Sequence, residues 1–210
     1  MGEMLDLGDV KSYVAGDDAR SPVVVLVHDY FGFLPHVRTY CDDLLDASLR
    51  VVAPDLYEGH QAKTDDEATR FLGALGALEA TKRVGAALAY AREGGSPMAV
   101  VGFSAGGWYA LDAAASTGVD AAVAYYAIHD ADQMNFPLLC HFAEHDEWPP
   151  DDRPEAFVEK VRERGGDVEA ITYPGTEHGF ANADIPAYDK KAARDAWRAT
   201  VDFLRRTLSG

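Results

Sequence analysis

One serine of this 210-residue chain has the surroundings of a nucleophile. Ser104 stands in Gly102–Gly106, which fits the pattern G-x-S-x-G, between the apolar run Met98–Val101 and a helical segment over 108–115. A strand-to-helix turn of this kind is tight and strained, and it lifts the serine hydroxyl above the sheet. The helix N-terminus behind the hydroxyl favours developing negative charge. A glycine-rich turn with a chance serine is the alternative, and the flanking strand and helix favour the nucleophile.

A serine hydroxyl needs a base to take its proton and an acid to orient that base. His178 is the predicted base rather than an ordinary loop histidine, because it lies on a Gly-flanked loop after the last predicted strand. The acid is expected on a loop that precedes this histidine in the chain. Asp146, after the predicted strand 136–142, is the predicted acid, with Glu144 and Glu147 as the alternatives in the same loop.

Two backbone N–H groups are expected to stabilise the oxyanion that attack by the serine creates. Ala105 directly follows the nucleophile and supplies one of them, and Tyr30, after the apolar strand 22–28, is predicted to supply the other. Aromatic side chains are abundant near these loops. We expect some of them to fill the core and others to meet the substrate. The predicted substrate contacts are Asp29, Phe31, Tyr57 and Trp148.

The elements that must position these residues alternate along the chain. Short apolar runs predict strands, and longer amphipathic segments predict helices. Strands are predicted within 5–14 and at 22–28, 50–53, 98–101, 121–127, 136–142 and 168–173. Helices are predicted at 36–47, 65–92 (broken near Gly73 or Gly76, with Thr81 as a cap), 108–115, 154–164 and 187–208.

This alternation predicts an α/β fold, with a mostly parallel sheet and helices on both faces. Residues 1–210 are expected to form a single domain, because no repeat or linker divides them. No long insertion follows the predicted strand 121–127, so the sequence predicts no lid domain and an open site.

Composition narrows the possible partners. The net charge of −16 predicts no binding to nucleic acid or to an anionic membrane surface. No apolar run has the length of a membrane span, and no signal peptide is visible at the N-terminus. Cys41 and Cys140 lack metal-ligand spacing and are expected to be buried free thiols. The sequence therefore predicts a cytoplasmic protein without metal or cofactor.

Six stretches of the chain, taken together and in order, resemble the dienelactone hydrolase family. They are His28–Gly32, Val51–Tyr57, Gly102–Gly107, Ala124–Tyr126, the loop of Asp146, and His178–Phe180. The resemblance runs from about residue 10 to residue 208. It implies an α/β-hydrolase fold without a lid, a triad of Ser104, Asp146 and His178, and oxyanion donors at Ala105 and Tyr30.

The chain also departs from this family. Founding members carry cysteine where this chain has Ser104, and glutamate where it has Asp29. They bind the substrate carboxylate with two arginines. Asn182 occupies one of these positions, and near the other, close to Asp65, only Lys63 and Arg70 are basic. These departures, the net negative charge and the aromatic loops favour an uncharged, moderately apolar substrate over an acidic lactone.

The sequence predicts a serine hydrolase that cleaves small carboxylic esters or lactones through an acyl-enzyme, as a monomer or a homodimer. One alternative is a thioesterase or acyltransferase with the same triad. The other is a catalytically weak, hydrolase-like binding protein, since a fold does not guarantee an activity.

Overall fold

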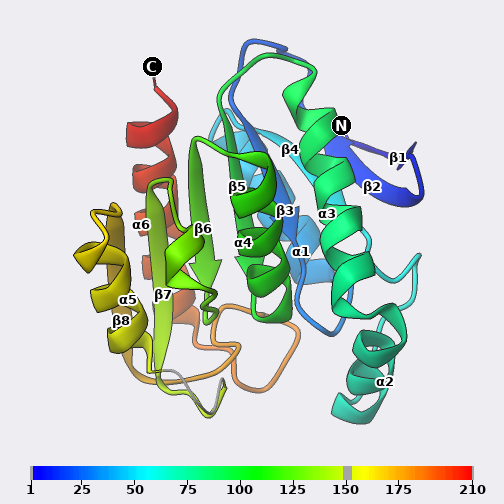
Figure 1. The fold of residues 1–210 in the computed structure, drawn as a ribbon. Helices are drawn as coiled ribbons and strands as arrows, with labels where there is room; N and C mark the ends of the chain where they lie inside the picture. The colour runs from blue at the N-terminus through cyan, green and yellow to red at the C-terminus, as the bar shows by residue number, and fades with distance from the viewer. Residues whose placement is uncertain (1, 149–152, 210) are drawn as a thin grey trace.

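The computed structural model describes residues 2–148 and 153–209. Its strands are β1 (Glu3–Leu7), β2 (Val10–Ala15), β3 (Val23–Val27), β4 (Arg50–Pro54), β5 (Met98–Phe103), β6 (Ala121–Tyr125), β7 (Leu138–His145) and β8 (Val168–Glu177). Within the described residues they form one eight-stranded sheet in the order β1-β2-β4-β3-β5-β6-β7-β8 (Figure 1). β2 is antiparallel to both of its neighbours, and all the other pairs are parallel.

Helices cover both faces of this sheet. They are α1 (Pro35–Asp46), α2 (Asp65–Leu75), α3 (Ala77–Arg92), α4 (Ala105–Thr117), α5 (Pro154–Glu163) and α6 (Lys190–Leu208), with the short 3-10 helix η1 at Ala131–Gln133. The apolar sides of α1 and α6 pack on one face, and those of α3, α4 and α5 on the other. α2 extends beyond the sheet, at the lower right of Figure 1.

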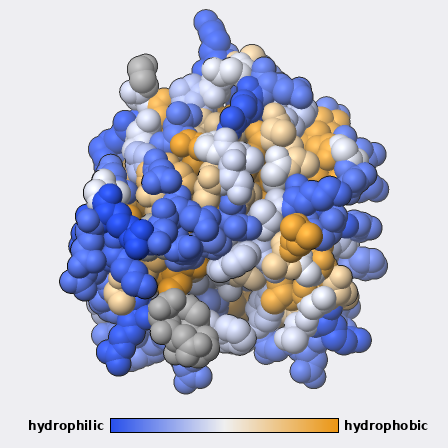
Figure 2. All heavy atoms as spheres, in the orientation of Figure 1, coloured by the Kyte–Doolittle hydropathy of each residue, from blue (hydrophilic) through white to orange (hydrophobic). Residues whose placement is uncertain are grey.

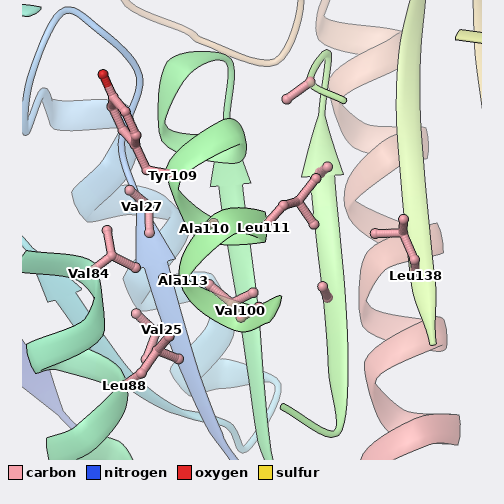
Figure 3. Packing of buried hydrophobic residues seen from close by; sticks show 14 of the residues in the cluster. Val25, Val27, Val84, Leu88, Val100, Tyr109, Ala110, Leu111, Ala113 and Leu138 are labelled. Atoms are coloured by element: carbon pink, nitrogen blue, oxygen red, sulfur yellow. The ribbon is translucent and has the colours of Figure 1, made fainter. Parts of the chain in front are cut away.

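The central strands are buried on both faces, which explains why they read as continuous apolar runs. Alternate residues of β3 point to opposite faces, so Val25 belongs to the cluster under α3 and α4, and Val24 to the cluster under α1 and α6. Figure 3 shows Val84 and Leu88 of α3 lying against Val25 and Val27 of β3. The predicted fold class is confirmed.

Several predicted boundaries were wrong. The segment 5–14 holds a hairpin of β1 and β2, joined at a turn where Gly8 has φ +65°. The long helical segment breaks at Gly76, with φ +71°, which is one of its two predicted break positions. Thr81 does not cap the second helix, because α3 begins at Ala77 and the Thr81 hydroxyl donates to Asp112 Oδ2 at 2.7 Å.

The other differences between predicted and observed boundaries follow from strand pairing and helix capping. β7 begins two residues after Phe136, beyond Pro137, which has no N–H to donate to a sheet. β7 and β8 both run further than predicted, because they pair with each other as far as His145 and Glu177. α6 begins at Lys190 rather than Ala187, after Asp189 accepts a hydrogen bond from Ala192 N.

A buried histidine predicts acid sensitivity of the fold. His141 on β7 is fully buried, with Nδ1 2.9 Å from the Tyr173 hydroxyl and Nε2 2.9 Å from Thr200 Oγ1. Burial lowers the pKa of His141 to about 3. In the unfolded chain a histidine has a pKa of about 6.5. The folded state therefore binds fewer protons, and the stability from neutral His141 is complete above about pH 6.5 and lost as the pH falls towards 3.

We expect His141 to reduce the free energy of unfolding by about 2 kcal/mol at pH 5 relative to pH 7.5. Urea denaturation of the wild type and of His141→Gln at both pH values measures this change in the free energy of unfolding. Glutamine is the chosen replacement because it keeps polar groups and does not titrate. The variant is expected to lose less stability on acidification than the wild type does. Equal losses in the two proteins would contradict this role of His141.

Candidate active site

The turn between β5 and α4 holds Ser104 in a conformation that L-residues rarely adopt. Its φ is +51° and its ψ −123°, and such backbone strain is concentrated at functional sites. Ser104 N donates to the carbonyl of Tyr125 on β6 at 2.9 Å, and the Ser104 carbonyl accepts from the amides of Gly107 and Trp108. The turn is therefore fixed from both sides, with the serine at the carboxyl edge of the parallel sheet.

His178 and Asp146 lie at the same edge, each one residue after a strand. β7 ends at His145 and β8 at Glu177, and these strands are neighbours in the sheet. His178 Nε2 is 2.7 Å from Ser104 Oγ. His178 Nδ1 is 2.9 Å from both carboxylate oxygens of Asp146. The side chain of Asp146 is 8% exposed and that of His178 is 24% exposed, so the pair is largely shielded from solvent.

The two alternative acids point elsewhere. Glu144 Oε2 accepts a hydrogen bond from the amide of Gly175 at 2.7 Å, which ties the end of β7 to the end of β8. Glu147 is exposed, and no hydrogen bond joins it to His178. Asp146 Oδ1 also accepts from the amide of Trp148 at 2.9 Å, and this bond fixes the loop that carries the carboxylate.

The loop of the second predicted oxyanion donor is held by Asp29. Asp29 Oδ1 accepts from the amide of Phe31 at 2.9 Å, and Oδ2 accepts from Asn182 Nδ2 at 2.7 Å. Both Asp29 and Asn182 are buried. Asn182 follows His178 by four residues, so this bond connects the loop of the histidine with the loop of Tyr30. Asp29 therefore lies behind the site, and it fixes the backbone on which the Tyr30 amide stands.

His28 supports the same loop from inside the core. Its Nε2 accepts from the amide of Leu56 at 3.0 Å, and its Nδ1 donates to the carbonyl of Asp29 at 2.6 Å. Burial lowers the pKa of His28. The imidazole is therefore neutral, with its proton on Nδ1, and its role here is structural.

A pocket of about 700 Å³ opens beside Ser104. Its lining residues are Tyr30, Asp65, Thr69, Leu72, Ala77, Ser104, Ala105, Trp108, Tyr109, Tyr126, Ala127, Ile128, Trp148 and His178. Ala105, whose amide begins α4, and Tyr30 both line the pocket with the serine, as the predicted oxyanion donors require. Such a volume is typical of sites that take small molecules.

One of the four predicted substrate contacts lines this pocket, and the other three do not. Trp148 lines it and is 70% exposed. Asp29, Phe31 and Tyr57 are not among its lining residues. Tyr57 is a core residue, and its ring packs against those of His28 and Phe71. Aromatic side chains fill interiors as readily as clefts, and their residue type alone does not separate the two.

The sequence pattern does not predict the wall of the pocket that α2 and the start of α3 supply, although the family resemblance places a substrate-binding position close to Asp65. Asp65, Thr69 and Leu72 of α2, and Ala77, form this wall. α2 is an ordinary amphipathic helix, capped by Thr64, whose Oγ1 accepts from the amide of Glu67 at 3.2 Å. No residue spacing in the sequence predicts that such a helix lines the pocket of the nucleophile. Only the tertiary arrangement reveals it.

Neither a metal centre nor a membrane span is apparent in the part of the chain that the structure describes. No group of three or more His, Cys, Asp or Glu side chains among residues 2–148 and 153–209 is placed to hold a metal ion. Within the same residues, no helix is both long and apolar enough to cross a bilayer. Cys41 and Cys140 are free and buried, and burial raises the pKa of both thiols.

A strained serine between strand and helix, above a mostly parallel sheet, with a histidine and an acid on loops of the same edge, defines an α/β-hydrolase. The chain belongs to the dienelactone hydrolase family, whose sequence model matches residues 10–208, and it is thus a carboxylic ester hydrolase. The family that the six stretches indicated is confirmed.

Relatives of similar length support this assignment. The chain is 28% identical to protein usf of Aquifex pyrophilus, with all of both chains covered. It is 27% identical to a "Putative carboxymethylenebutenolidase" of Aquifex aeolicus, over 99% of this chain and 100% of that one. A dienelactone hydrolase-like promiscuous phosphotriesterase from metagenomic libraries has the same fold, with a TM-score of 0.83 at 19% identity. That similarity covers 100% of this chain and 98% of the other.

Proposed function

We propose that the protein hydrolyses small carboxylic esters or lactones through a Ser104–His178–Asp146 triad and a covalent acyl-enzyme. The observation that carries the proposal is the 2.7 Å separation of Ser104 Oγ and His178 Nε2, with Asp146 on the other ring nitrogen. A cytoplasmic location and a monomeric or homodimeric state stay predictions from the sequence.

In the first half of the reaction, His178 Nε2 takes the proton of Ser104 as the Oγ atom attacks the ester carbonyl. The Nδ1–H group donates to Asp146, which keeps the lone pair of Nε2 directed at the serine and stabilises the imidazolium. The amides of Ala105 and Tyr30 donate to the oxyanion. The imidazolium then gives its proton to the leaving alkoxide, and the acyl group stays on Ser104.

In the second half, a water molecule replaces the alcohol. His178 takes a proton from this water, hydroxide adds to the acyl carbon, and the carboxylic acid leaves as Ser104 regains its proton. In a lactone the leaving alkoxide remains joined to the acyl group, so the product is a single hydroxy acid. The amides of Ala105 and Tyr30 stabilise an oxyanion in each half of the reaction, because a tetrahedral intermediate forms in both.

Covalent labelling tests this proposal. A fluorophosphonate probe reacts with an activated serine, and intact-mass analysis with peptide mapping is expected to find one adduct, on Ser104. His178→Ala should lower the rate of labelling by roughly 10²–10³-fold, because the base is lost. The control is His60→Ala, an exposed histidine outside the pocket, which should label at the wild-type rate.

Absence of an adduct on the folded protein would contradict the proposal and would favour the hydrolase-like binding protein instead. Labelling of His178→Ala at the wild-type rate would also contradict it. Comparison of hydrolysis of p-nitrophenyl acetate with hydrolysis of the matching thioester then separates an esterase from a thioesterase.

A further inference from the structure

The wall of the pocket that α2 supplies carries a carboxylate, that of Asp65. Besides the catalytic pair and Ala105, the lining is largely apolar or aromatic, with Leu72, Trp108, Tyr126, Ile128 and Trp148 among its members. Among the residues that the structure describes, Asp65 is the only acidic member of this lining, and no lysine or arginine belongs to it. Asp65 is exposed and lies among mostly apolar lining side chains, so a charged group bound in this pocket would meet its charge at short range.

The position of this carboxylate is fixed from two directions. Asp65 is the first residue of α2, and Asp65, Asp66 and Glu67 occupy the first turn, where the helix N-terminus favours negative charge. The hydroxyl of Tyr30 donates a hydrogen bond to Asp65 Oδ1 across the pocket. Burial, together with this bond, raises the pKa of Tyr30, so the hydroxyl stays protonated and remains a donor.

Large apolar side chains are exposed among the lining residues of the pocket and next to them in the chain. Leu78 of α3 is 87% exposed, and Trp108 and Trp148 are 39% and 70% exposed. Figure 2 shows a mostly hydrophilic surface on which hydrophobic side chains gather at the lower right, where α2 and the start of α3 lie in Figure 1. An alkyl or aryl group bound here would gain apolar contacts and would also meet the charge of Asp65.

We infer that this pocket binds the part of the substrate remote from the ester carbonyl, that it takes an apolar group with an uncharged or cationic end, and that Asp65 is the residue that excludes carboxylates. This inference rests on the proposed function, since it names the substrate class of that site. The net charge of −16 adds to the same selectivity at long range, but salt screens that contribution more strongly.

Three p-nitrophenyl esters of equal acyl length test the inference, with an uncharged methyl, a carboxylate or a trimethylammonium group at the far end of the acyl chain. We measure kcat/KM for each ester with the wild type, Asp65→Asn and Asp66→Asn. Asparagine at position 65 still accepts the hydrogen bond of Tyr30. Asp66 is exposed on the same helical turn but does not line the pocket, so its variant controls for the loss of one charge.

Asp65→Asn is expected to raise the ratio of carboxylate to uncharged ester by about 5- to 10-fold, and to lower the ratio of trimethylammonium to uncharged ester by a similar factor. Asp66→Asn is expected to change each ratio by less than about 2-fold. Equal changes in the two variants, or no change in either, would overturn the role of Asp65.

The proposed function fails by a different observation. If Ser104→Ala hydrolyses the three esters as well as the wild type does, the triad is wrong whatever the ratios are. If Ser104→Ala is inactive and the ratios of Asp65→Asn equal those of the wild type, the triad stands and only the inference about Asp65 falls.

Discussion

Replacing Ser104 with alanine is expected to lower kcat/KM for p-nitrophenyl acetate by about 10⁴-fold or more. The reason is that the alanine has no oxygen to attack the carbonyl, while His178 and Asp146 act only through that oxygen. Triad members work as a unit, so loss of the nucleophile removes nearly the whole contribution of the other two. The residual rate would come from the oxyanion donors and from binding.

Steady-state hydrolysis with purified protein measures this effect. Titration of the active serine with a fluorophosphonate shows whether wild-type enzyme contaminates the variant. Ser116→Ala is the matched control, because Ser116 lies in the last turns of α4, the helix that Ser104 precedes, and its hydroxyl bonds only to the Asp112 carbonyl at 3.2 Å. That variant should keep wild-type activity. Turnover by Ser104→Ala within 100-fold of the wild type would rule out the assignment of Ser104 as the nucleophile.

Gly106→Ala is expected to reduce the free energy of unfolding by about 3 kcal/mol or more. A Cβ atom built at Gly106 would lie 2.0 Å from the carbonyl oxygen of His28 and 2.8 Å from that of Val27. Both neighbours are backbone atoms, so no side-chain rotation relieves the clash. α4 would have to move away from the end of β3, in the middle of the sheet.

Urea denaturation compares Gly106→Ala with Gly85→Ala. Gly85 lies within α3, and a Cβ there would meet no atom within 4 Å, so alanine should stabilise the fold by about 0.5–1 kcal/mol. If Gly106→Ala does not fold at all, the yield of soluble protein at 20 °C relative to Gly85→Ala reports the same effect. Wild-type stability of Gly106→Ala would refute the close approach of α4 to β3.

The site residues that sequence predicted best are those whose position depends on short segments. Ser104 is defined by its own strand, turn and helix, and His178 by its place after the last strand. Parallel strands bring the loops at their carboxyl ends to one edge, which is why residues 32 and 74 positions apart can be expected to meet. The sequence distinguishes Asp146 from Glu144 less clearly, because both carboxylates lie at the end of β7.

The features that sequence did not predict depend on contacts between distant elements. The role of α2 as a wall of the pocket requires the docking of that helix beside the loop of Tyr30. The burial of Tyr57 requires the ring of Phe71 and the imidazole of His28. The hairpin of β1 and β2 has a local signal, the turn at Gly8, but two short strands in one amphipathic stretch were interpreted as one.

The bond between Asp29 and Asn182 joins residues 153 positions apart. Closing so long a loop is slow compared with forming a helix or a hairpin. The bond can form only after both distant segments have docked on the sheet, and it then fixes the loop of the base and the loop of Tyr30 to each other.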